Sequence, residues 1–115
     1  MKAILAVTAA LLLALTAAAQ VDASGQRRAV LKLAAAHPVS LRGSKFLAGE
    51  QVTVVVHSAG RTKARTVTAG EAGGFLVRFG NLPFDRCQGF LALARGARGS
   101  VARFKLPELM CPPRL

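Results

Sequence analysis

The segment LRGSKFLAGEQVTVVV, residues 41–56, contains the residue types that most nearly suggest phosphate chemistry. A phosphate-binding loop needs the order G-x-x-x-x-G-K-[ST] between a strand and a helix, so that backbone amides and the lysine surround the phosphates. Here Lys45 follows Ser44, and a valine-rich strand pattern comes next. Because the order of serine and lysine is reversed and a strand, not a helix, follows, the segment does not match a phosphate-binding loop. We interpret it as a turn, in which Phe46 packs beneath the loop and Gly49 supplies positive φ before a strand.

Acid–base catalysis would require titratable side chains that converge on one place. Downstream of the amino-terminal segment the carboxylates are few and widely separated, and each lies beside an expected turn or strand end. They are Glu50, Glu71, Asp85 and Glu108. We therefore predict that the protein is not an enzyme and that it has no catalytic residues.

The two histidines, His37 and His57, are the only imidazoles that the sequence offers to a metal ion. His37 precedes a proline in a connection, whereas His57 ends an expected strand. No second histidine at helical spacing and no methionine-rich cluster accompanies either of them. We predict no metal site and no cofactor, and retain a small metal or ligand carrier, which would use the end of the domain near these histidines, as the alternative function.

Cys87 and Cys111 are the only cysteines. In an oxidising compartment an even pair is most simply a disulfide. Such a bond would close a loop of about 25 residues and contribute roughly 3–4 kcal/mol in the chain-entropy account. Bonded cysteines cannot act as nucleophiles, and the sequence contains no C-x-x-C redox motif.

Arginine and lysine are the residues that imply a partner. The chain has 16 of them against 5 aspartates and glutamates, which gives a formal net charge of +11. Such a field attracts polyanions, most strongly at low ionic strength. The expected alternation of side chains along a strand places three cations on one of its faces, and three more lie at and after an expected turn. The polyanion-binding residues predicted in this way are Arg61, Lys63, Arg65, Arg95, Arg98 and Arg103. A surface charged only for solubility, with arginine enriched by a GC-rich genome, is the alternative explanation.

Specific recognition of nucleic acid is not expected, because proteins that bind single strands interleave aromatic side chains on which the bases stack. The chain has six Phe and neither Tyr nor Trp, and several Phe fall at inward positions of the expected strands. The period-two pattern also leaves no basic amphipathic helix for membrane attack. We predict an anionic cell-wall polymer or an envelope protein as the partner.

The first 23 residues, MKAILAVTAALLLALTAAAQVDA, have the layout of a secretory signal peptide. Lys2 supplies the positive charge, an apolar run extends from Ala3 to about Ala19, and small residues follow. A retained membrane anchor is the alternative, but the small-residue exit and the missing stop-transfer charge favour cleavage. We predict a signal peptide at 1–23, a single domain at 24–115 without a transmembrane segment, and a secreted or envelope-associated location.

Downstream of Arg28 the apolar residues recur mostly with period two, which predicts β-strands. Six or seven short strands at intervals of 8–12 residues are typical of a sandwich or barrel. We expect strands at 30–33, 39–42, 52–57, 62–68, 75–79, 87–94 and 102–106. The predicted inner-face residues are Leu31, Val52, Val54, Val56, Phe75, Val77, Phe79, Leu93 and Phe104.

These turn and strand patterns carry a family resemblance. Residues 43–54, GSKFLAGEQVTV, resemble the G-x-x-F-x-x-G-E-x-V-x-V signature of bacterial extracellular immunoglobulin-like modules, and residues 73–77, GGFLV, resemble a later strand-opening motif of the same modules. The resemblance spans about residues 29–106. It implies an all-β immunoglobulin-like sandwich of six or seven antiparallel strands that serves as a spacer, adhesion unit or binding appendage. The chain lacks the tryptophan that pins antibody-type domains.

The carboxy-terminal part departs from those modules. The order of Cys87, a basic turn and then Cys111 resembles small secreted proteins of unknown function from GC-rich bacteria. Taken together, the sequence predicts a secreted, basic, non-enzymatic immunoglobulin-like module that associates with anionic cell-envelope polymers or with an envelope protein. A disulfide would tether its carboxy-terminal segment to the domain.

Overall fold

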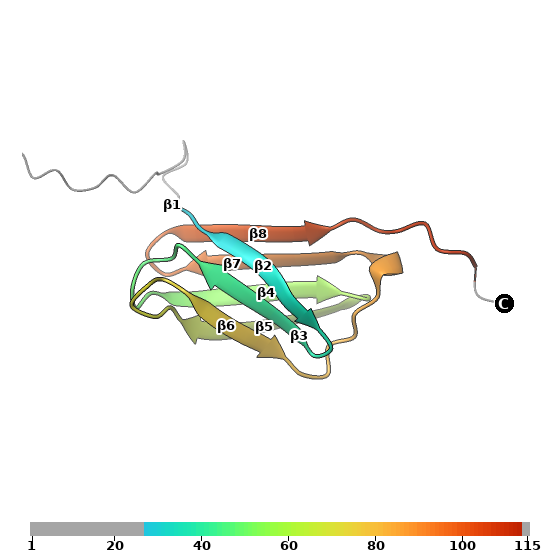
Figure 1. Cartoon of the computed structure of the whole chain (residues 1–115), viewed down its shortest axis with the longest axis horizontal. Coiled ribbons are helices and arrows are strands. Elements are labelled where there is room, and N and C mark those ends of the chain that lie inside the picture. The colour runs from blue at the N-terminus through green and yellow to red at the C-terminus, as the bar shows by residue number, and fades with distance from the viewer. Residues whose placement is uncertain (1–26, 114–115) are drawn as a thin grey trace, which may run out of the picture.

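The computed structural model describes residues 27–113, which form two facing β-sheets (Figure 1). The strands are β1 (Arg27–Arg28), β2 (Val30–Ala36), β3 (Val39–Ser44), β4 (Gln51–Ser58), β5 (Arg61–Thr68), β6 (Phe75–Phe79), β7 (Phe90–Gly96) and β8 (Ser100–Leu106). A short 3-10 turn, η1 (Arg86–Gln88), precedes β7. The prediction of an all-β domain is confirmed for these residues, whereas the predicted signal peptide at 1–23 lies outside them.

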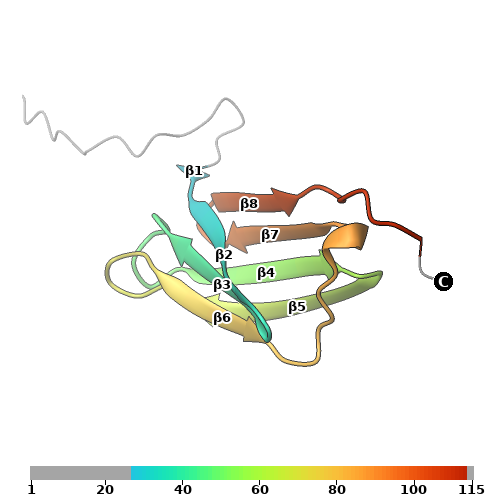
Figure 2. The ribbon, with the colours of Figure 1, turned by 45° about the vertical axis from the view of Figure 1, so that its right-hand side comes forward.

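The larger sheet has the strand order β1-β8-β7-β4-β5, and the smaller has the order β2-β3-β6. Figure 2 shows the three-stranded layer crossing the five-stranded layer at an angle. All pairings are antiparallel except that of β1 with β8, which is parallel. The prediction of six or seven antiparallel strands is therefore wrong in number and in this one pairing, because the two-residue strand β1 is too short to show a period of two. The described part of the chain therefore begins in the larger sheet at β1 and passes into the smaller one at β2.

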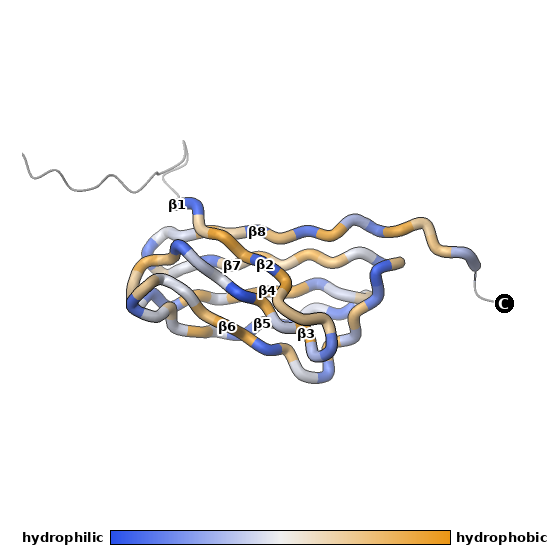
Figure 3. The backbone as a smooth tube through the Cα atoms, viewed as in Figure 1, coloured by the Kyte–Doolittle hydropathy of each residue, from blue (hydrophilic) through white to orange (hydrophobic). Residues whose placement is uncertain are grey.

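The core lies between the two sheets and follows from alternation along the strands, which Figure 3 displays as hydropathy. Val52, Val54 and Val56 are fully buried, as their β-branched period-two pattern predicts. Phe46 is also buried, and its ring packs on Phe75 with 5.1 Å between centroids. Gly49 has φ +72°, so the interpretation of residues 41–56 as a turn leading into a strand is confirmed.

Two details of β7 differ from expectation. The strand begins at Phe90 and not at Cys87, because the Asp85 carboxylate accepts a hydrogen bond from the Cys87 amide at 2.9 Å and caps η1. Leu93 was predicted to face the core, but it lies on the outer face and is 37 % exposed. Since β7 carries apolar residues on both faces, its pattern alone does not reveal which set points inward. In the structure Ala92 and Ala94 face the core and are buried.

The predicted disulfide is present and joins Cys87 in η1 to Cys111 beyond β8, with 5.8 Å between the Cα atoms. The segment after β8 otherwise makes one backbone hydrogen bond to η1, from the Leu109 amide to the Arg86 carbonyl at 3.1 Å. The Leu109 side chain is half exposed and that of Met110 is fully exposed. The disulfide is thus the main covalent constraint on this segment.

Replacing both Cys87 and Cys111 by alanine should lower the free energy of unfolding by about 3 kcal/mol, because the loop between them is no longer closed in the unfolded chain. Denaturant unfolding of the oxidised protein and of the double variant measures the difference. Reduced wild-type protein is the control and should have the same unfolding midpoint as the double variant. Equal midpoints for all three samples would contradict a stabilising role of the tether.

Candidate functional site

Three of the predicted polyanion-binding residues lie on β5, at the open edge of the larger sheet. The register pairs Lys63 with Val56 and Arg65 with Val54, so both cations project toward the inner side of that sheet. Arg61 occupies the corresponding position opposite Ser58. Lys63 and Arg65 therefore border the gap between the two sheets, whereas Arg61 lines a hollow at the end of the larger sheet.

Lys63 and Arg65 are bound to the opposite sheet. The Lys63 Nζ donates to the carbonyl oxygen of Gly80 at 3.0 Å, and the Arg65 guanidinium donates to the carbonyl oxygen of Arg78. We call these two cations, with their carbonyl partners on and just after β6, the edge clasp. A polyanion would have to compete with these structural hydrogen bonds.

The other predicted residues flank or occupy the turn between β7 and β8: Arg95 lies on β7, Arg98 in the turn and Arg103 on β8. Arg95 and Arg103 point outward from the larger sheet, where the register places Arg95 opposite Val101 and Arg103 opposite Leu93. The guanidinium of Arg98, within the turn, donates to the carbonyl oxygen of Ala48. The structure therefore separates the six predicted cations into an edge group on β5 and a group around β8.

Arg28, which is not among the predicted residues, completes the second group. It lies on β1 opposite Val101, and it lines a shallow hollow of about 430 Å³ together with Arg95 and Arg103. Leu93 and Val101 also line this hollow, and none of its lining residues is acidic. We call this site the arginine hollow. A neighbouring hollow shares Arg28 and is lined in addition by Arg27 and Lys45.

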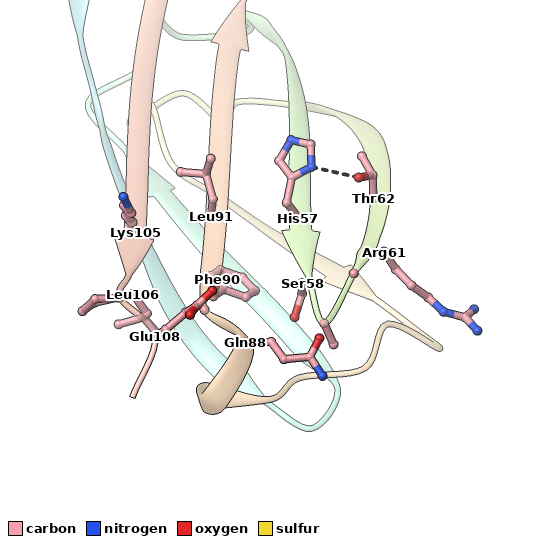
Figure 4. Close-up of a pocket in the computed structure, with 14 residues that line it drawn as sticks. His57, Ser58, Arg61, Thr62, Gln88, Phe90, Leu91, Lys105, Leu106 and Glu108 are labelled. Atoms are coloured by element: carbon pink, nitrogen blue, oxygen red, sulfur yellow. Dashed lines mark hydrogen bonds between the residues drawn. The ribbon is translucent and has the colours of Figure 1, made fainter. Parts of the chain in front are cut away.

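A further hollow of about 550 Å³ lies at the other end of β7 and β8 (Figure 4). The register places Lys105, Leu91, His57 and Thr62 in one row across four adjacent strands. The Nδ1 atom of His57 and the Oγ1 atom of Thr62 are 2.8 Å apart and share a hydrogen bond. Glu108 contributes the only carboxylate among the lining residues of this hollow. We call it the terminal hollow.

His37 lies elsewhere, in the connection between β2 and β3, and its ring packs edge-on against Phe84 with 6.2 Å between centroids. His57 projects from the outer face of β4 and bonds to Thr62. The two histidines thus have different immediate surroundings, an aromatic ring in one case and a threonine hydroxyl in the other.

The outer face of the smaller sheet also carries three cations. Lys32 and Arg42 are directly opposite each other on β2 and β3, and Arg78 lies opposite Ser40 on β6. All three side chains are exposed. These residues carry the same charge as the arginine hollow on the opposite side of the domain, which makes them a matched comparison for it.

The buried carboxylate of Glu50 holds the turn that positions the arginine hollow. The residue is only 1 % exposed. Its Oε1 accepts hydrogen bonds from the Ser100 hydroxyl at 2.6 Å and from the Leu47 amide at 3.1 Å. Its Oε2 accepts from the amides of Arg98 at 2.8 Å and Ser100 at 3.4 Å. A side chain on Gly96 would collide with this carboxylate, so glycine is required there.

The same turn holds β1. The Arg27 amide donates to the carbonyl oxygen of Gly99 at 2.9 Å, and the Ala29 amide donates to that of Val101 at 2.8 Å. Glu50 fixes the turn between β7 and β8, and the backbone of this turn and of β8 pairs with β1. Through this pairing Arg28 lies across Val101 from Arg95, and both line the arginine hollow. The sequence motif G-E thus contributes to the site indirectly, through backbone geometry.

Burial by itself would raise the pKa of Glu50, but the hydrogen bonds from the Ser100 hydroxyl and from the amides of Arg98, Leu47 and Ser100 outweigh it. The pKa of Glu50 is therefore lowered from its ordinary value of 4.5. A carboxylate with a lowered pKa stabilises the folded state above its unfolded pKa, and this contribution is lost as the pH falls through the folded value.

Glu50→Gln should reduce the free energy of unfolding at neutral pH by roughly 2–3 kcal/mol, since the amide nitrogen that replaces one oxygen cannot accept from the donors around it. Denaturant unfolding at pH 7 measures this loss. Repeating it at decreasing pH should show the wild-type advantage shrinking below about pH 4.5 as the carboxylate protonates. A difference in free energy of unfolding between wild type and variant that stays constant down to pH 2 would contradict this role. Glu71→Gln, at an exposed loop residue, is the control and should leave the free energy of unfolding nearly unchanged.

Among residues 27–113, no group of three or more His, Cys, Asp or Glu side chains is placed to hold a metal ion. Within the same residues, no helix has the length and apolar character needed to cross a membrane. No family model matches the chain, and neither the curated proteins nor the solved structures that we compared with it include a match.

Proposed function

We propose that the protein is a secreted, non-enzymatic immunoglobulin-like module that binds anionic polymers of the cell envelope through the arginine hollow. The strand orders β2-β3-β6 and β1-β8-β7-β4-β5 support the immunoglobulin-like assignment, because two facing sheets of short and mostly antiparallel strands are the architecture of this class. The signal-peptide pattern and the Cys87–Cys111 disulfide, a bond typical of oxidising compartments, support secretion.

The observation that carries the binding proposal is the arginine hollow itself. Three guanidinium side chains, those of Arg28, Arg95 and Arg103, line one concave site in which no carboxylate takes part. A guanidinium presents paired donors that match the oxygens of a phosphate or carboxylate in a bidentate arrangement. Bringing three like charges around one hollow is unfavourable in isolation, and a bound anion would relieve that repulsion.

The composition of the outer face favours a polymer with a sugar or polyol backbone over a nucleic acid. The outward residues beside the arginines are Leu93, Val101 and, on β4, Thr53 and Val55. The two Phe of β7 and β8, Phe90 and Phe104, pack instead with the core. Because bases are held mainly by stacking on exposed aromatic rings, the outward strand positions of this sheet offer them little.

The test is co-sedimentation of the oxidised protein with purified bacterial cell wall over a series of salt concentrations. The triple variant Arg28→Gln, Arg95→Gln and Arg103→Gln should lose most of the retention that wild-type protein shows at about 0.15 M salt. The matched control is Lys32→Gln, Arg42→Gln and Arg78→Gln, which removes the same charge from the opposite face and should retain binding. Thermal unfolding of both variants checks that each remains folded.

Equal loss of retention in the two triple variants would contradict the proposal, since it would mean that net charge alone causes the association. Retention that persists in wild-type protein at about 0.5 M salt, where the Debye length is only a few ångströms, would support a shaped site. Absence of retention at every salt concentration would reject an envelope polymer as the partner.

A further inference from the structure

The arginine hollow and the terminal hollow lie along the same two strands. The first is lined by the carboxyl half of β7 and the amino half of β8, and the second by the opposite halves and the residues that flank them. Arg103 lines the first and Lys105 the second, and these residues are two positions apart on β8 with both side chains on the outer face. The two hollows are therefore consecutive parts of one surface.

The cations on this surface form a ladder whose spacing follows from strand geometry. Residues two apart on a strand face the same side and are separated by about 6.7 Å. The Val101 row carries Arg28 and Arg95, the next row carries Arg103, and the third carries Lys105. The first and third rows are about 13 Å apart by the same repeat.

Apolar side chains occupy the positions between these cations. Val101, Leu93 and Leu91 succeed one another from the first row to the third, and Leu93 is exposed whereas the other two are half-buried. The C–H surface of a sugar or polyol unit can rest on such side chains while its charged group meets a flanking cation. Glu108, the only carboxylate that lines either hollow, lies at the far end and would repel an anionic chain there.

We propose that the ligand is a linear polyanion, with one phosphate or carboxylate per sugar or polyol unit, that runs along β7 and β8 from the arginine hollow to the terminal hollow. This inference rests on the proposed function and adds the form of the ligand and its direction on the sheet. A compact anion could occupy the arginine hollow but could not reach Lys105 at the same time.

The experiment is calorimetric titration of the oxidised protein with glycerol phosphate oligomers of increasing length, at a constant ionic strength of about 0.15 M. The affinity per oligomer, corrected for the number of equivalent ways in which it can bind, should rise with length until an oligomer spans about 13 Å and should then level off. Units beyond Lys105 meet Glu108, and Arg61, the other cation that lines the terminal hollow, lies on β5 and not along β8. Monomeric glycerol 3-phosphate should bind on the order of tenfold more weakly than the spanning oligomer, since it meets one row of cations at a time. A parallel series of oligouronates distinguishes phosphate-bearing from carboxylate-bearing polymers.

Single variants locate the polymer on the ladder. Lys105→Gln should weaken binding of the long oligomers roughly two- to fivefold, the range for one exposed ion pair, and leave binding of the shortest oligomer unchanged. Arg95→Gln should weaken both. Arg42→Gln removes the same charge from the opposite face, and both affinities should be retained.

Two results would overturn the inference while leaving the proposed function in place. One is an affinity that does not depend on length in either series, which would indicate a compact site. The other is an equal effect of Lys105→Gln and Arg42→Gln on long oligomers together with a larger effect of Arg95→Gln, which would indicate that Lys105 acts only through the general field while the arginine hollow binds the anion. If no oligomer of either series binds at any length, the inference fails and so does the proposed function.

Discussion

The hydrogen bonds around the Glu50 carboxylate are the interaction on which the arrangement of the described surface depends. A charged group is retained in a protein interior only when donors replace the water that it loses, and here amides and a hydroxyl from two distant turns do so. The carboxylate fits because Gly96 has no side chain. The carboxylate holds the turn between β7 and β8, and β1 pairs with β8 beside this turn. As a result, cations from β1, β7 and β8 line one hollow.

Much of the fold is predictable from the sequence because burial on one face imposes a period of two. The β-branched residues of β4 show it most clearly, and Phe46 with Gly49 marks the turn before it. Prediction fails where the pattern carries no directional information. Leu93 belongs to a strand that is apolar on both faces, and β1 has only two residues, too few for any period to be recognised.

The site is less predictable because it depends on which residues from separate strands become neighbours. Arg28 comes to line the same hollow as Arg95 only through the parallel pairing of β1 with β8, which no local pattern encodes. Conversely, the alternating cations of β5 suit its position at the edge of the larger sheet but give no indication of the carbonyl groups across the gap to which Lys63 and Arg65 donate. A positive charge in the sequence therefore identifies the chemistry, and tertiary structure decides whether that charge binds a ligand or the protein itself.

The edge clasp has a consequence for the proposed binding of several molecules to one polymer. Proteins concentrated side by side are exposed to aggregation through unpaired strand edges, which can extend a sheet from one molecule into the next. In this domain, β5 and β6 form adjoining edges, and Lys63 and Arg65 place cations between them while occupying two carbonyl groups. An approaching copy would present the same charges. Dense coverage of an anionic polymer is thus compatible with each domain remaining a separate folded unit.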